Sequence, residues 1–365
     1  MSNAWRRRAP ARVAAVLLVA GCGVPAAEQV GVIPRGEARP AVTEWRFDTR
    51  EHLSLWYHAL GFVLPGRDSL PLAIYSQAAR SDALAAARRA GINRTPLEQA
   101  ADSLAAEFGG SSRYDQLQFL PLYFENEAAL FNGIALFVQA EGNPQRAGSQ
   151  QGAQAVALLG NMFTTARQRR WIGEFARVVQ QERDAYYRAW WRERDRALRP
   201  VVDSAHAEWQ RLQPALAPLM QHLQLRGGEV LLVPSLAAEG RTVSSNAMLR
   251  AAVGAAPGTS GTDVVYEVLH ELMYALVADP IQQYVAPAAL RDLGEDVVSS
   301  RAAARAGLLV LERLAPGHAA GYRRFYLRAA GRPGSDAAAF RAAFPLPADL
   351  ERGLARAVEE ALAGI

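Results

Sequence analysis

The sequence contains no lysine and only one cysteine, Cys22, among its 365 residues. All 40 basic residues are therefore arginine, and four of them precede Cys22, where no acidic residue occurs. Residues 22–365 carry the same number of arginines as acidic side chains, 36 of each. This balance gives no reason to expect nucleic acid or an anionic membrane surface as a partner. A single cysteine also excludes an intrachain disulfide, so the fold must rest on its hydrophobic core.

Several patterns of catalytic and membrane-spanning proteins are also missing from the sequence. It has no glycine-rich phosphate loop, no nucleophile elbow and no cysteine–histidine pair. The long apolar stretch at residues 119–140 is interrupted by Pro121, Glu125 and Glu127, which excludes a membrane span. Four of the six histidines show no spacing that is typical of a metal site: His52, His58, His206 and His222.

Residues 1–21 have the features of a bacterial secretion signal. Arg6–Arg8 precede a short apolar run, Val13–Ala20, which is too short to span a bilayer. The following Val19–Cys22 segment resembles the lipobox of bacterial lipoproteins, whose cysteine is lipidated and becomes the first mature residue. The resemblance implies a lipoprotein held at a membrane by Cys22, facing the periplasm or the cell exterior. Gly23 in place of Asp favours the outer membrane, and the alternative is a chance buried or free cysteine.

The remaining chain divides into a tether and two structured regions. Residues 22–43 are broken by glycine and proline and predict a tether, and residues 44–226 predict almost only helices. Thr95 followed by Pro96 indicates a helix start. A charged helix, or pair of helices, is expected over residues 165–212, and its aromatic stripe is typical of a helix–helix core: Tyr186, Tyr187, Trp190 and Trp191.

The pattern changes at residue 227. Residues 228–236 and 241–249 predict two strands, separated by a turn at 238–240. Four helices are then expected, at residues 264–278, about 288–315, 317–330 and 348–363. The sequence thus predicts a predominantly α (α+β) fold, with a helical region at 44–226 and a region at 227–365 that is compatible with the same domain.

The helix expected at 264–278 contains the sequence HELMY, which begins at His270 and Glu271. Asp263, Glu267, His270, Glu271 and Tyr274 fall within roughly 100° of helical arc, and the rest of the helix is apolar. Thr262 or Asp263 is the expected cap. Because the flanking residues are so apolar, we expect this ionisable side to be enclosed and paired with other groups.

The stretch HELMYALVADP resembles the helix of a poorly characterised bacterial family of secreted and lipid-anchored proteins, whose motif is HEF-x-HSFVNP. The preceding VPSLAAEGRT, residues 233–242, is similar to the same family, which in turn resembles gluzincin zinc metallopeptidases. The resemblance implies zinc bound by His270, by the residue at 274 and by Glu295, with Asp296 as a weaker candidate. It also implies Glu271 as general base and Tyr322 as the group that stabilises the oxyanion. For Tyr322 an aromatic core is the simpler interpretation.

Tyr274 departs from the family pattern, because it stands where the second histidine ligand belongs. Deprotonating a tyrosine for metal binding costs about 4 kcal/mol at pH 7. Three interpretations stay open: an inactive descendant of a peptidase, a weakened site using His270, Tyr274 and Glu295, or an unrelated helix. We therefore predict a lipoprotein with a degenerate metallopeptidase-like domain, zinc weakly held or absent, and a peptide or protein ligand. The alternative is a non-enzymatic periplasmic binding or scaffold lipoprotein.

Overall fold

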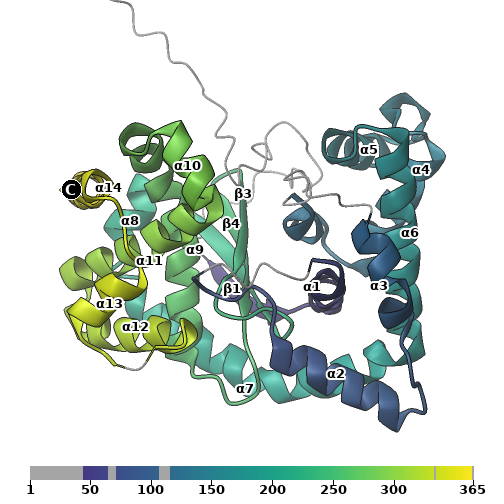
Figure 1. The fold of residues 1–365 in the computed structure, drawn as a ribbon, viewed down its shortest axis with the longest axis horizontal. Helices are drawn as coiled ribbons and strands as arrows, with labels where there is room; N and C mark the ends of the chain where they lie inside the picture. Colours follow the sequence, from purple (N-terminus) through teal and green to yellow (C-terminus); the bar gives the residue numbers. More distant parts are fainter. Residues whose placement is uncertain (1–43, 65–70, 107–115, 333, 364–365) are drawn as a thin grey trace, which may run out of the picture.

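The structure is a computed structural model that describes residues 44–64, 71–106, 116–332 and 334–363. The predicted signal peptide, the tether and the predicted lipidation site Cys22 lie outside these residues. Within the described part of the chain, no helix is both long enough and apolar enough to cross a bilayer. The fold is predominantly helical with one small four-stranded sheet, which confirms the predicted fold class (Figure 1).

Helices make up most of the described chain from Glu51 to His222. They are α1 (Glu51–Val63), α2 (Gln77–Arg89), α3 (Pro96–Ala106), α4 (Glu127–Gln139), α5 (Gln150–Met162), α6 (Ala166–Glu182), α7 (Arg188–Leu212) and α8 (Ala217–His222). Short turns η4 (Leu120–Tyr123), η5 (Pro144–Arg146) and η6 (Arg183–Tyr187) connect some of them. Thr95 caps α3 as expected, because its hydroxyl accepts the Glu98 N–H at 3.2 Å while Glu98 accepts the Thr95 N–H at 2.9 Å.

The expected charged helix is formed by α6 and α7, which run on from each other through the π-helical turn η6. The reciprocal bonds of a capping box between Thr165 and Gln168 begin α6. The aromatic stripe of this long helix is buried, with Tyr187 fully enclosed, and belongs to the hydrophobic core of the N-terminal helices. The interpretation of the stripe as helix–helix core is therefore confirmed.

The sheet draws its strands from both regions of the chain. Its order is β1 (Trp45–Thr49), β2 (Gly227–Val233), β4 (Met248–Gly254) and β3 (Arg241–Ser245). The first two contacts are parallel and the last is antiparallel. The sequence did not predict β1, because five residues carry too little pattern and the strand depends on pairing with β2, which begins 182 residues after Trp45.

The second predicted strand, 241–249, is wrong as a single element. Its residues form a hairpin, with β3 and the start of β4 joined at Asn246 and Ala247. Both residues have positive φ angles, 51° and 62°, as the central pair of a tight hairpin turn requires. Alanine is unusual in this conformation. Because Ala247 stands where glycine normally follows the asparagine, the sequence lacks the Asn-Gly signal of such a turn.

In the described part of the chain six helices follow the sheet, where the sequence predicted four, because the helix expected at about 288–315 is divided and the short helix at residues 337–343 was not predicted. The six helices are α9 (Gly261–Tyr284), α10 (Pro287–Leu293), α11 (Glu295–Leu314), α12 (Pro316–Ala329), α13 (Ala337–Ala343) and α14 (Ala348–Ala363). Ser260 caps α9, so the expected cap at Thr262 or Asp263 is wrong. The helix expected at 288–315 is two helices, because Gly294 has a φ of 83° and breaks it.

The sheet separates two hydrophobic cores. Figure 1 shows the N-terminal helices on one side of the sheet and the C-terminal helices on the other. On β2, Leu231 and Val233 point into the core of α1–α6, and Val230 and Leu232 point into the core of α9, α11, α12 and α14. This alternation is what a strand that is covered on both faces must have. The C-terminal helices therefore pack on one face of the sheet, and α9 is the one that carries His270 and Glu271.

Candidate functional site: a buried carboxylate–histidine group

Helix α9 is buried on nearly all sides in its central turns. Val264, Val268 and Leu269 are 0 % exposed, and each such side chain contributes on the order of 2 kcal/mol on burial. His270 is also 0 % exposed and Glu271 only 3 %. Glu267, His270 and Glu271 are therefore enclosed, as the sequence predicted, and need partners inside the protein, whereas Asp263 and Tyr274 on the same side are only partly buried.

The main partner comes from the turn between β2 and β3. Glu239 is 3 % exposed, and its two carboxylate oxygens accept hydrogen bonds from two different helices. The Tyr274 hydroxyl of α9 donates to one oxygen, and the Ser300 hydroxyl of α11 donates to the other at 2.9 Å. The Arg241 guanidinium lies 3.9 Å from Glu239 and is anchored by Gln118, which accepts from its Nε at 2.6 Å. The turn is thereby tied to both helices.

His270 has an acceptor at each ring nitrogen. Its Nδ1 lies 3.3 Å from a Glu271 carboxylate oxygen, and its Nε2 lies 3.3 Å from the backbone oxygen of Ser300. An imidazole that faces two acceptors satisfies both only as the doubly protonated cation. Thr242 of β3 donates to the other Glu271 oxygen at 3.0 Å. Both oxygens of Glu271 are therefore also occupied.

The electrostatics of the group agree with this hydrogen bonding. Burial on its own would lower the pKa of His270, but the neighbouring carboxylates of Glu239 and Glu271 outweigh it and raise that pKa. Burial raises the pKa of Glu239, although His270 and Arg241 oppose the effect. Two cations, Arg241 and protonated His270, can thus balance the two carboxylates. Glu267, one turn before Glu271, has its pKa raised well above the usual range by burial.

The same three side chains could hold a metal ion. One oxygen each of Glu239 and Glu271 and one nitrogen of His270 lie within 4.8 Å of one another. Over the described ranges, this is the one group of at least three such side chains that meets this spacing. Two carboxylates and an imidazole are a donor set that divalent metals accept, provided that His270 gives up its proton.

Glu295, expected as the third ligand, is not a member of this group. It lies in the first turn of α11 and is only partly buried, and Asp296 adds to the burial that raises its pKa. The break at Gly294 sets this position, because α11 reaches the group at Ser300, about 7.5 Å further along its axis. Asp296, the weaker candidate, is not in the group either. Glu239, and not Glu295, is the carboxylate that lies beside His270 and Glu271 in the structure.

Tyr274 lies beside the group as a hydrogen-bond donor. Its hydroxyl donates to Glu239, and its ring meets the His270 ring edge-on at 5.3 Å. Burial, followed by the charges of Glu239 and Glu271, raises the pKa of Tyr274 well above 10. The neutral phenol is therefore the stable form in this arrangement, and ligation by Tyr274 would require its proton to leave.

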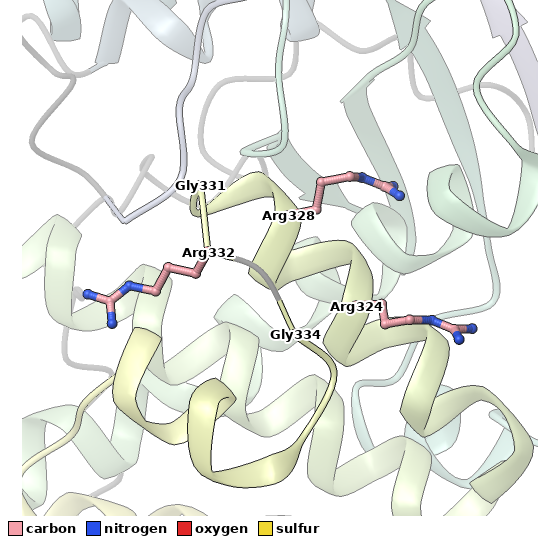
Figure 2. A pocket seen from close by; sticks show the side chains of 5 residues that line it. All are labelled: Arg324, Arg328, Gly331, Arg332 and Gly334. Carbon is pink, nitrogen blue, oxygen red and sulfur yellow. The ribbon is translucent and has the colours of Figure 1, made fainter.

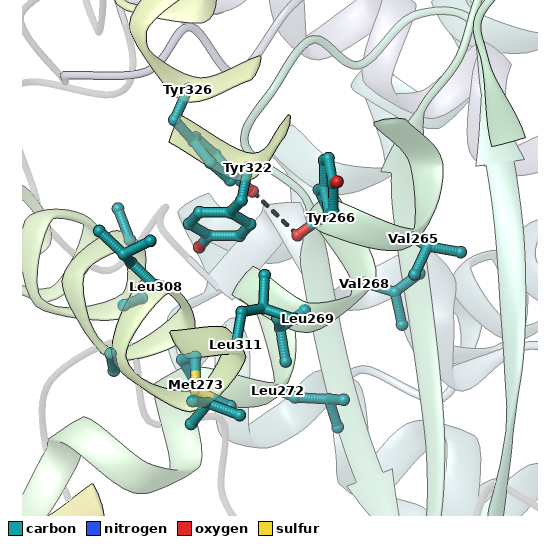
Figure 3. Close-up of a cluster of buried hydrophobic side chains, with 14 of the residues drawn as sticks. Val265, Tyr266, Val268, Leu269, Leu272, Met273, Leu308, Leu311, Tyr322 and Tyr326 are labelled. Atoms are coloured by element: carbon teal, nitrogen blue, oxygen red, sulfur yellow. Dashed lines mark hydrogen bonds between the residues drawn. The ribbon is translucent and has the colours of Figure 1, made fainter. Parts of the chain in front are cut away.

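Tyr322 is fully buried, and its hydroxyl packs against Gly307 of α11. The aromatic side chain that stacks on His270 is Tyr326, with ring centres 5.3 Å apart and planes at 29°. Tyr326 donates a hydrogen bond to the backbone oxygen of Tyr266 at 3.2 Å (Figure 3). Tyr322 thus belongs to the aromatic core of α9, α11 and α12, as the simpler interpretation held.

Sequence reasoning missed Glu239, Arg241 and Ser300. A signal for two of them was present, because Glu239 and Arg241 are the only charged side chains between Val230 and Leu249. Two charges inside an apolar strand–turn–strand segment need partners. Ser300 carries no comparable signal, because serine is common in helices and only the packing of α11 against α9 brings it to the group.

A second polar feature lies at the end of α12. A surface pocket there is lined by Arg324, Arg328, Gly331, Arg332 and Gly334. Figure 2 shows Arg324 and Arg328 leaving the helix on one side and Arg332 on the other, so the three guanidinium groups do not converge. Arg328 is already paired with Asp263 at 2.9 Å. These exposed arginines therefore do not form a built anion site.

Comparisons with known proteins were made at the level of families, sequences and structures. No family model, no curated protein and no solved structure matches this chain. The resemblance to gluzincin-like helices therefore has no support beyond the residues of α9 and of the segment 233–242.

Proposed function

We propose that this chain is a membrane-anchored bacterial lipoprotein whose metallopeptidase-like body holds a divalent cation without hydrolysing peptides. The ligands are Glu239, His270 and Glu271, and zinc is the proposed metal because carboxylate and imidazole donors suit it. The observation that carries the proposal is the convergence of these three buried side chains within 4.8 Å. A bound ion supplies the positive charge that the His270 proton otherwise supplies.

The enclosure of the group supports a non-hydrolytic role. A zinc peptidase keeps one coordination position open to water and substrate. Here Glu239, His270 and Glu271 are 3 %, 0 % and 3 % exposed, which leaves a peptide carbonyl no approach in this conformation. Glu271, the general base that the motif implies, has both oxygens engaged by His270 and Thr242. We therefore propose that Glu271 is a ligand in this protein.

The anchor is a separate part of the proposal. The lipobox-like segment that ends at Cys22 supports attachment to a membrane by acyl chains, with the described body facing the periplasm or the cell exterior. The outer membrane is the proposed site because Gly23 follows the cysteine. A peptide or protein that docks on the body is the proposed partner.

A second candidate is a non-enzymatic scaffold lipoprotein whose buried group is only structural. The charge balance favours it, because Arg241 and protonated His270 already offset two carboxylates without any added ion. Buried pairs of this kind hold elements in register. In this candidate the group fastens the β2–β3 turn to α9 and α11.

Metal analysis of the full chain, purified in detergent, decides between the two candidates. After loading with zinc and desalting, we expect bound zinc that a mild chelator removes, and no zinc-dependent cleavage of casein. Absence of bound zinc would favour the scaffold. Cleavage that zinc restores after chelation would contradict the proposed non-hydrolytic role.

A further inference from the structure

The surroundings of the buried group are unequal in their access to solvent. Ser300, Arg241 and Tyr326 are 1 %, 7 % and 0 % exposed. Ser300 donates a hydrogen bond to Glu239, the Arg241 guanidinium lies within 4 Å of Glu239, and the Tyr326 ring stacks on His270. Tyr274 and Thr242 are the contacting side chains that are partly exposed. The side of the group that carries these two hydroxyls is therefore the side nearest to solvent.

Tyr274 contacts two of the three proposed ligands at once. Its hydroxyl donates to Glu239, and its ring packs edge-on against His270. Thr242 is shorter and reaches only Glu271. The other aromatic ring against His270 is that of Tyr326, which is stacked on the imidazole and fully buried, with its hydroxyl bonded to the Tyr266 backbone. A cation cannot enter past this ring without opening the aromatic core.

From this arrangement we infer that Tyr274 is the gate of the cation site: it covers the ligands, and its hydrogen bond to Glu239 holds the cover in place, so an ion passes only when the side chain moves away. The inference rests on the proposed function, because it assumes that the group binds a cation. Entry and exit of the ion then require the Tyr274 side chain to swing away from Glu239 and His270. Its partial exposure gives it space to do so, which Tyr326 lacks.

The test measures how fast zinc leaves the full-length protein when an excess of a chromophoric chelator is added. Three variants are compared with the parent: Tyr274→Phe, which removes only the hydroxyl, Tyr274→Ala, which removes the cover, and Tyr326→Phe. The last variant makes the same chemical change on the fully buried ring that stacks on His270 and is the matched control. We expect release to be about tenfold faster in Tyr274→Phe, faster still in Tyr274→Ala, and unchanged in Tyr326→Phe.

Each outcome bears on one of the two claims. If all four proteins hold zinc and release it at the parental rate, or if Tyr326→Phe accelerates release as much as Tyr274→Phe, the gate is wrong while the cation site stands. If none of the four takes up zinc, both the gate and the proposed function are wrong.

Discussion

Tyr274 stands where a His-Glu-x-x-His motif would have its second histidine. Its hydroxyl satisfies Glu239, and a histidine at the same position of α9 would offer a second imidazole beside His270. Histidines at i and i+4 on one helix face can bind the same metal. Because imidazole is smaller than phenol, the substitution asks for no additional space.

We predict that Tyr274→His raises zinc affinity at least tenfold, as measured by competition with a chromophoric chelator. Adding Glu239→Ala should remove the gain, whereas adding Glu295→Ala should leave it, because Glu239 and not Glu295 lies in the group. Equal affinity in the parent and in Tyr274→His would mean that position 274 does not face the ion.

The buried His52 should account for part of the loss of folding stability at low pH. It is 3 % exposed, and burial together with the charge of Arg50 lowers its pKa to about 4. In the unfolded chain the pKa is about 6.5, so between these values the unfolded state binds a proton that the folded state does not. The contribution of neutral His52 to the free energy of unfolding is fully present above pH 6.5. It is lost as the pH falls towards 4, by about 3 kcal/mol in all.

Urea denaturation of the parent and of His52→Gln at pH 6.5 and pH 4.5 checks this prediction. The free energy of unfolding should fall less between the two pH values in His52→Gln, because the other titrating groups are shared. If it falls equally in both proteins, His52 does not remain neutral in the folded state.

The β3–β4 hairpin is the element with the least favourable local sequence. Ala247 adopts a φ of 62°, which costs a residue with a Cβ roughly 1 kcal/mol and costs glycine nothing. We therefore predict that Ala247→Gly stabilises the protein by about 1 kcal/mol. Urea denaturation should show a higher midpoint with an unchanged slope. A lower midpoint would show that backbone entropy, and not strain, dominates at this turn.

Helices and strands that depend on neighbouring residues could be predicted from the sequence, and those that depend on distant contacts could not. The start of α3 at Pro96 follows from Thr95 and Glu98, which bond to each other three residues apart. Strand β1 was missed because its hydrogen-bonding partner β2 lies 182 residues away. The break between α10 and α11 depends on one glycine, Gly294, whose φ of 83° suits a residue without a Cβ.

The candidate site shows the same division. His270 and Glu271 could be found because their type and spacing fit a known chemistry. Glu239 lies 31 residues before His270, in a turn that only the packing of the sheet on α9 brings to it. The resemblance implied Glu295 of α11 as a ligand. Helix α11 does contact the group, but through Ser300 and not through Glu295. No spacing rule in the sequence distinguishes these two residues.

For the whole molecule, we predict that Cys22 decides where the protein resides. Cys22→Ser should abolish incorporation of labelled palmitate and shift the protein from the membrane fraction to the soluble fraction. The described body carries no membrane-crossing helix that could replace the anchor. Palmitate labelling that persists in Cys22→Ser would show that the lipobox-like segment is not the site of lipidation.

The claim on which this account depends is that a cation binds Glu239, His270 and Glu271 between the sheet and α9. Calorimetric titration of zinc into the parent, Glu239→Gln and Glu295→Gln tests it most directly, because both variants replace a carboxylate by an amide of equal size. We predict that Glu239→Gln weakens binding more than tenfold and that Glu295→Gln binds as the parent does. Loss of binding in Glu295→Gln, with Glu239→Gln unaffected, would contradict the account.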